Sequence, residues 1–276
     1  MKIRLISSLV AALILFFAVL MPLWFFLIAL SVVMIIAIME YFAALKNKNH
    51  IFPFGPVLAA VFIIIPIWYI VVYRSPLGNF KLQTEQLILL WIMTTVALCA
   101  CTCIFTNMKY SIADVSLSVF GLIYIVIPFT LTVWIRSQYF GFYFIWLIFL
   151  GAWITDISAY FTGRLLGKRK IVPLISEKKT VEGFIGGIIG CTAVITIYGV
   201  WMQTKGINVP FTYYMILGAL SGFISQLGDW FASCIKRYLR IKDFGNIMPG
   251  HGGVLDRFDS IFAVVPLVYV FIIIVF

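Results

Sequence analysis

The sequence predicts an all-α polytopic membrane protein. Hydrophobic residues make up 63% of its 276 residues and charged residues only 11%, whereas soluble domains average roughly 45–50% apolar and about 25% charged residues. A soluble core of this length is too small to bury so many apolar side chains, and disordered chains combine low hydrophobicity with high charge. Composition therefore excludes both classes and indicates a chain embedded in the bilayer.

About nine apolar runs are long enough to be read as transmembrane helices, since a helix needs about 20 residues to cross the hydrocarbon. The first two are separated only by Met21 and Pro22, which favours a tight hairpin over one broken helix. No small-x-small cleavage site precedes Pro22, so the first run is expected to remain as an uncleaved span. The runs cover residues 5–20, 23–45, 57–73, 87–106, 115–135, 142–162, 184–202, 211–231 and 257–276.

The basic residues predict the orientation. With nine spans and an internal N-terminus, all but four of the 20 Lys and Arg fall on the cytoplasmic side; the exceptions are Arg74, Lys81, Arg136 and Lys205. This bias agrees with the positive-inside rule.

Five cysteines are present, and the three in one apolar run, Cys99, Cys101 and Cys103, are expected to be small buried thiols.

Acidic residues gather at the same membrane face. Only one of the ten, Glu85, falls in an external loop. Carboxylates near hydrocarbon are costly, so the cluster predicts a functional or metal site, with salt bridges to neighbouring Lys and Arg as the alternative. The residues at the inner ends of the last four spans are Asp156, Glu177, Glu182, Asp229, Asp243, Asp256 and Asp259.

The first cytoplasmic segment of interest covers residues 164–183. Its glycines allow close backbone approach, and Lys178, Lys179 and Thr180 offer positive charge and donors at the start of a predicted helix, where phosphate binds readily. Contact with anionic lipid is the alternative. A P-loop is excluded, because only three residues separate Gly163 from Gly167-Lys168 and Arg169 replaces the Ser or Thr that binds magnesium.

The second segment, from Gly228 to Asp259, carries dense charge of both signs. Asp256 and Asp259 are spaced i, i+3 and share one face at a helix start, so together with Asp229 they are candidates for a divalent cation. Oxygen ligands at a phosphate site favour Mg²⁺ over zinc. His251, flanked by glycines, is equally compatible with orienting a phosphate and with acid-base chemistry.

This segment resembles the signature of the phosphatidate cytidylyltransferases, or CDP-diacylglycerol synthases. The matching residues read Ser-x-x-Lys-Arg-x4-Lys-Asp-x-Gly-x2-Met-Pro-x-His-Gly-Gly-x2-Asp-Arg-x-Asp, from Ser233 to Asp259. The resemblance extends to Asp156-x-x-Ala-Tyr160-x-x-Gly163 and to Ser176–Gly183, about the C-terminal half of the chain. Two positions depart from the pattern: Glu177 stands where proline is usual, and Met248 where Leu, Ile or Phe is usual.

The resemblance implies condensation of CTP with phosphatidate to CDP-diacylglycerol and pyrophosphate. Residues 1–140 would then form N-terminal transmembrane helices and 141–276 a catalytic transmembrane region, with the site at the cytoplasmic helix ends. It implies Mg²⁺ on Asp229, Asp256 and Asp259, and catalytic roles for Asp229, Asp256, Lys236 and Arg257. The substrate-binding residues it implies are Ser176, Lys178, Lys179, Thr180, Glu182, Arg237, Lys242, Asp243, His251 and Asp259.

Other classes fit the sequence less well. A transporter would carry ionisable groups near the midplane in matching halves, and a lipid-binding scaffold has no need of clustered acids. A CTP-dependent lipid kinase is the alternative within enzymes.

The expected partners are CTP, phosphatidate and membrane lipids, without nucleic acid, in the plasma membrane of a bacterial source. Small-xxx-small pairs such as Gly183 with Gly187 and Gly218 with Gly222 predict helix-packing faces and are compatible with a homodimer.

Overall fold

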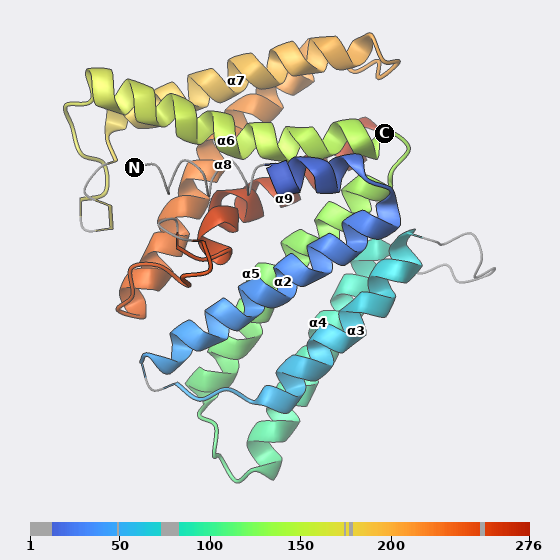
Figure 1. Cartoon of the computed structure of the whole chain (residues 1–276), viewed down its shortest axis with the longest axis vertical. Helices are drawn as coiled ribbons and strands as arrows, with labels where there is room; N and C mark the ends of the chain where they lie inside the picture. Colours follow the sequence, from blue (N-terminus) through green and yellow to red (C-terminus); the bar gives the residue numbers. More distant parts are fainter. Residues whose placement is uncertain (1–12, 49, 73–82, 174, 177–178, 249–251) are drawn as a thin grey trace. The chain divides into compact units, whose positions relative to one another are not determined.

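The protein is all-helical, as expected, in a computed structural model (Figure 1) that describes residues 13–48, 50–72, 83–173, 175–176, 179–248 and 252–276. The contacts between its residues divide the chain into two compact units. The first unit comprises Met1–Ser137 and Leu239–Asp256, and the second comprises Gln138–Tyr238 and Arg257–Phe276. The segment before the last helix therefore returns to the N-terminal unit.

The helices of the first unit are α2 (Leu23–Lys46), α3 (Phe54–Val72), α4 (Thr84–Phe105) and α5 (Ile112–Ser137). Residues 13–20 are also helical and stop before Met21, so the helix is interrupted at Met21-Pro22, as both the hairpin and the broken helix require. Indole nitrogens link the helices: Trp68 donates to the Thr130 hydroxyl at 2.9 Å, and Trp91 donates to the Ala60 carbonyl at 2.9 Å. Because hydrocarbon offers no competing partner, such bonds help to fix which helices are neighbours.

The start of α5 is held by Asp114. Its carboxylate accepts hydrogen bonds from the Ser111 backbone at 3.1 Å and the Ser111 hydroxyl at 2.7 Å. Its other oxygen lies 2.7 Å from Nδ1 of His50, which belongs to the connection between α2 and α3. This acid therefore caps a helix and anchors a loop.

The second unit contains α6 (Gly141–Leu166), α7 (Val181–Gln203), α8 (Phe211–Tyr238) and most of α9 (Leu255–Val275). Glycines let these helices pack closely: a Cβ added at Gly218 would lie 2.7 Å from the Thr192 Cα, and one at Gly222 would lie 2.7 Å from the Ile188 Cα. The predicted helix-packing faces are thus confirmed. Since they are used within the chain, these glycines carry no argument for a homodimer.

Seven helices of the described residues are long and apolar enough to cross a membrane, and α8 is not among them. Residues 211–231, which were expected to form a span, are helical. Unlike a uniformly apolar helix, however, α8 carries polar side chains that are buried inside the protein, namely Ser221, Ser225 and Gln226. It also continues to Tyr238, so residues 232–238, which lie beyond the expected span, form its last turns. Lys236 and Arg237 favour this extension because cations stabilise a helix C-terminus.

The cysteines of α4 differ in exposure. Cys99 and Cys103 are buried, as expected, but Cys101 is exposed. The expectation was wrong for Cys101 because residues at i and i+4 share a helix face, whereas the residue between them points to the opposite side.

Candidate functional site

The connection between α6 and α7 forms a narrow loop that returns to the N-terminus of α7. Lys170 and Thr180 form an antiparallel bridge, and the Val181 N–H donates to the Arg169 carbonyl at 2.9 Å. The Thr180 side chain accepts the Gly183 N–H at 3.1 Å, which satisfies one of the free N–H groups at the helix start. This pairing fixes the position of Lys179, the residue immediately before the helix cap.

Glu182, in the first turn of α7, closes the other side of the loop. Its carboxylate accepts the backbone N–H of Lys168 at 3.0 Å and that of Arg169 at 3.3 Å. Thr180 and Glu182, both expected to bind substrate, thus shape the loop through their own contacts. Thr180 is buried, and a Cβ added at Gly163 would lie 3.0 Å from its hydroxyl.

Lys179 forms an ion pair with Asp229 of α8, with 2.7 Å between Nζ and Oδ2. Both side chains remain partly exposed, at 30% and 24%. Burial, the largest single influence, lowers the pKa of the Lys179 ammonium, but Asp229, Asp156 and Asp259 together raise this pKa above its usual value. Lys179 is therefore a permanent cation that carboxylates hold at the start of α7.

Asp156 of α6 and Asp259 of α9 lie in the same cluster. The Asp156 side chain hydrogen-bonds to Ser260 and interacts electrostatically with Lys179 and Asp229. Asp259 is 9% exposed and interacts with Asp229, Asp156 and Lys236. Four segments of the second unit thus bring three carboxylates together with lysines.

Gly228 allows α8 to approach α9 beside this cluster. A Cβ at this position would lie 2.9 Å from the Asp259 carbonyl oxygen and 2.7 Å from the Ala263 Cβ. Any side chain at Gly228 would push the two helices apart. The glycine thereby brings the neighbouring Asp229 close to Asp259.

Two other residues that were predicted to supply positive charge, Lys236 and Arg257, also belong to the second unit and interact with this cluster. Lys236 lies two turns after Asp229 on α8 and interacts with Asp259. Arg257, in the first turn of α9, is exposed and interacts with Asp156. Positive groups from the loop, α8 and α9 therefore surround carboxylates, an arrangement suited to binding a polyanion together with a cation.

Carboxylate oxygens are of the chemical type that magnesium prefers, but no group of three or more His, Cys, Asp or Glu within the described residues is arranged to hold a metal. Mg²⁺ commonly takes only one or two protein carboxylates and completes its shell with water and phosphate oxygens. Asp229 and Asp259 supply oxygen ligands of that kind from neighbouring helices.

Asp256 belongs to the first unit, at the start of α9. Its Oδ2 accepts the Phe244 N–H at 2.8 Å and the Gly253 N–H at 3.0 Å. Asp243 lies nearby: a Cβ added at Gly252 would lie 3.2 Å from the Asp243 Cβ. Gly252 has φ +82°, a left-handed conformation that favours glycine. Asp256 thus organises the loop before α9 with one of its oxygens.

The remaining predicted residues are less constrained. Ser176 donates its backbone N–H to the Val172 carbonyl at 2.8 Å, and Arg237 and Lys242 are exposed. Lys178 and His251 lie outside the described residues, as does Glu177. Asp156 belonged to the predicted acidic gathering and to a motif but was given no catalytic, substrate-binding or metal role, and its contacts now place it in the cluster.

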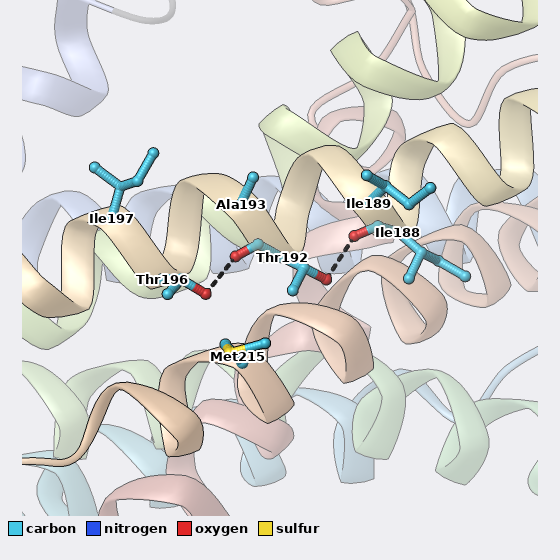
Figure 2. Close-up of a pocket in the computed structure, with 7 residues that line it drawn as sticks. All are labelled: Ile188, Ile189, Thr192, Ala193, Thr196, Ile197 and Met215. Carbon is cyan, nitrogen blue, oxygen red and sulfur yellow. Dashed lines mark hydrogen bonds between the residues drawn. The ribbon is translucent and has the colours of Figure 1, made fainter.

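A groove between α7 and α8 offers a contrasting environment (Figure 2). Its Thr192 and Thr196 hydroxyls donate to backbone carbonyls of their own helix at 2.7 Å. The groove presents apolar surface without a titratable side chain, so we place the candidate site at the N-terminal end of α7 instead. Its lining residues are Ile188, Ile189, Thr192, Ala193, Thr196, Ile197 and Met215.

Comparison with known proteins gives a consistent result. The sequence profile described as the cytidylyltransferase family matches residues 2–275. Two similar proteins are both named phosphatidate cytidylyltransferase: one from Staphylococcus saprophyticus is 39% identical over 165 residues, and one from Bacillus subtilis is 40% identical over 161 residues. These matches span 60% and 58% of this chain and 62% and 59% of the relatives, so less than two thirds of each relative is covered.

Proposed function

The chain belongs to the cytidylyltransferase family, and we propose that it condenses CTP with phosphatidate to give CDP-diacylglycerol and pyrophosphate. The observation that carries this proposal is the ion pair between Lys179 and Asp229, which joins the first motif segment to the second. Around it, Asp259 and Lys236 provide the mixed charge that a reaction between two polyanions requires.

In this reaction a phosphate oxygen of phosphatidate attacks the α-phosphorus of CTP, and the bond to pyrophosphate breaks. The second pKa of a phosphate monoester is about 6, so the nucleophile is largely ionised at neutral pH and needs little general-base help. The main task of the protein is to offset repulsion between the substrates. Lys179, Lys236 and Arg257 supply positive charge for this purpose.

We further propose that Mg²⁺ binds Asp229 and Asp259, and we infer from its place in the motif that Asp256 is a catalytic residue. When bound, the ion would neutralise triphosphate charge and stabilise the charge that develops on the leaving group. The protein side chains fix where the phosphates lie: the loop before α7 places Lys179, and α8 places Asp229 and Lys236.

The site is proposed to face the cytoplasm at the membrane surface. The positive-inside distribution of Lys and Arg supports this orientation, and in a bacterial source the membrane would be the plasma membrane. The acyl chains of the lipid can then remain in the bilayer while its headgroup reaches Lys179 and Asp229.

The test is a product assay with the full chain purified in detergent and supplied with CTP, phosphatidate and Mg²⁺. We expect a cytidylylated lipid and pyrophosphate in equal amounts. In a parallel assay with diacylglycerol in place of phosphatidate, a lipid kinase would instead convert diacylglycerol and CTP to phosphatidate and CDP. Formation of CDP without cytidylylated lipid would contradict the proposal.

A further inference from the structure

Glu40 is a buried acid of the N-terminal half that neither the motif nor the proposed chemistry explains. It lies on α2 and is only 6% exposed. Its carboxylate accepts two backbone N–H groups that are more than 200 residues distant in sequence: Val254 donates to Oε1 at 2.9 Å and Leu255 donates to Oε2 at 2.8 Å. Both donors belong to the start of α9, whose first N–H groups have no partner within the helix.

The contacts of Glu40 adjoin those of Asp256. Three consecutive N–H groups, at residues 253, 254 and 255, are accepted by carboxylates, the first by Asp256 and the other two by Glu40. Charge-assisted bonds of this kind are stronger than those between neutral groups. The backbone leading into α9 is therefore held by two acids rather than by a conventional cap.

The loop is shaped to admit this carboxylate. Side chains at Gly245 and Gly253 would collide with the Glu40 carboxylate. Between these two glycines, the Met248 N–H donates to the Gly252 carbonyl at 3.0 Å, which closes the turn. The absence of side chains at both glycines and the matching acceptor on α2 together make a specific socket for Glu40.

We propose that Glu40 is a positioning residue for the reaction: it fixes the first turn of α9 and so the direction of the Asp256 carboxylate. This inference rests on the proposed function. A charged side chain near hydrocarbon is costly and usually functional, and an apolar contact could join α2 to the loop without that cost. The carboxylate is needed because it orients backbone donors, which an apolar side chain cannot do.

The test compares Glu40→Gln with Glu85→Gln, the same substitution at an exposed glutamate in the first turn of α4. Glutamine keeps the volume but offers a single acceptor oxygen, so one of the two N–H groups loses its partner. We expect kcat to fall at least tenfold in Glu40→Gln, with KM for CTP and phosphatidate changed less than about threefold, because misorientation affects the chemical step more than binding. Glu85→Gln should behave as wild type.

Two further measurements separate positioning from folding. Hydrogen exchange at residues 252–256 should be faster in Glu40→Gln but unchanged in Glu85→Gln. Glu40→Asp retains the charge with a shorter reach, so its kcat should lie between wild type and Glu40→Gln. If glutamine prevents folding, Gly253→Ala provides a second route, since its methyl group would displace the carboxylate while leaving Glu40 in place.

The outcomes are decisive in each case. A kcat within twofold of wild type in folded Glu40→Gln overturns the proposal. The proposal is also overturned if activity in Glu40→Gln, Glu40→Asp and Gly253→Ala falls only in proportion to the loss of folded protein. Glu40 would then be a structural residue. If wild-type protein makes no cytidylylated lipid, the proposed function fails, whereas the exchange measurement still reports whether Glu40 holds the loop.

Discussion

The Lys179 ammonium lies 2.7 Å from the Asp229 carboxylate, so the segment just before α7 is tied to the later part of α8. This pair connects the two motif segments through residues that are 50 positions apart in the chain. A substrate phosphate entering the site would compete with Asp229 for Lys179, whereas a magnesium ion would compete with Lys179 for Asp229. The pair thus supports the proposal that an anion and a cation bind side by side here.

Lys179→Gln should raise the KM for CTP about tenfold, equivalent to ~1.4 kcal/mol, with a smaller change for phosphatidate. Glutamine removes the charge at the start of α7, while the lipid keeps its own anchor in the bilayer. Steady-state kinetics with each substrate varied in turn would measure this, and Lys205→Gln, in the connection between α7 and α8, is the control. A selective rise in the KM for phosphatidate would assign the loop to the lipid headgroup.

The ionisation of Lys179 should not be visible in the pH dependence of activity. Its pKa is raised above the usual value of 10.5, so the ion pair is fully present below the ordinary lysine pKa and is lost only as pH rises through the higher value of the folded protein. Between about pH 6 and pH 9, the profiles of kcat/KM for wild type and Lys179→Gln should have the same shape. An alkaline limb present only in wild type would contradict this assignment.

Asp256→Asn should lower turnover roughly 100-fold or more while the protein stays folded in the membrane. Asparagine can still accept the N–H groups of Phe244 and Gly253 through its amide oxygen, so the loop is retained while the negative charge is lost. The assay is turnover at saturating substrates, with a thermal unfolding curve alongside. Asp114→Asn is the matched control: this acid caps α5, so its loss should lower stability with kcat near normal. Near-normal turnover of Asp256→Asn would remove Asp256 from the chemistry.

Gly222→Ala should destabilise the second unit, because its methyl carbon would lie 2.7 Å from the Ile188 Cα. Overpacking of this kind typically costs about 1–3 kcal/mol. Gly55→Ala makes an ideal comparison, since nothing lies within 4 Å of an added Cβ there. Thermal unfolding in detergent should show a lower Tm only for Gly222→Ala, and equal Tm values would refute the close contact between α7 and α8.

Cysteines introduced at Lys170 and Arg240 should react with an impermeant thiol reagent only after the membrane is opened, because both residues are predicted to face the cytoplasm. The background must lack the five native cysteines, since Cys101 and Cys234 are exposed. A cysteine at Lys205 should react from outside intact cells. Labelling of Lys170→Cys from outside would reverse the proposed orientation.

Much of the fold follows from the sequence because membrane helices are long and apolar. The expected span at 115–135, for example, became α5 over Ile112–Ser137, since charged and turn-forming residues mark where hydrocarbon ends. The continuation of α8 to Tyr238 was missed because charged residues looked like the end of a span, although a helix can continue beyond the bilayer.

The site was predictable to the extent that its residues lie in local motifs. Asp229, Asp259 and Lys179 were expected from spacing and resemblance, and the structure brings these three into one cluster. Glu40 was not, because its partners lie more than 200 residues away and no local pattern signals such a contact. The double hydrogen bond of Asp256 to the loop was equally hidden, since it depends on the path of the backbone.

The glycines between α7 and α8 also restrict how the protein can move. At one-turn intervals along α8, two large residues flank two glycines, and each of the two large residues faces a glycine on α7. The facing pairs are Tyr214 with Gly199, Gly218 with Thr192, Gly222 with Ile188, and Gln226 with Gly187. A slide of one turn, about 5.4 Å, would press Tyr214 or Gln226 against the backbone of α7. A slide of one turn between α7 and α8 is therefore sterically blocked, and we expect these two helices to move as one piece.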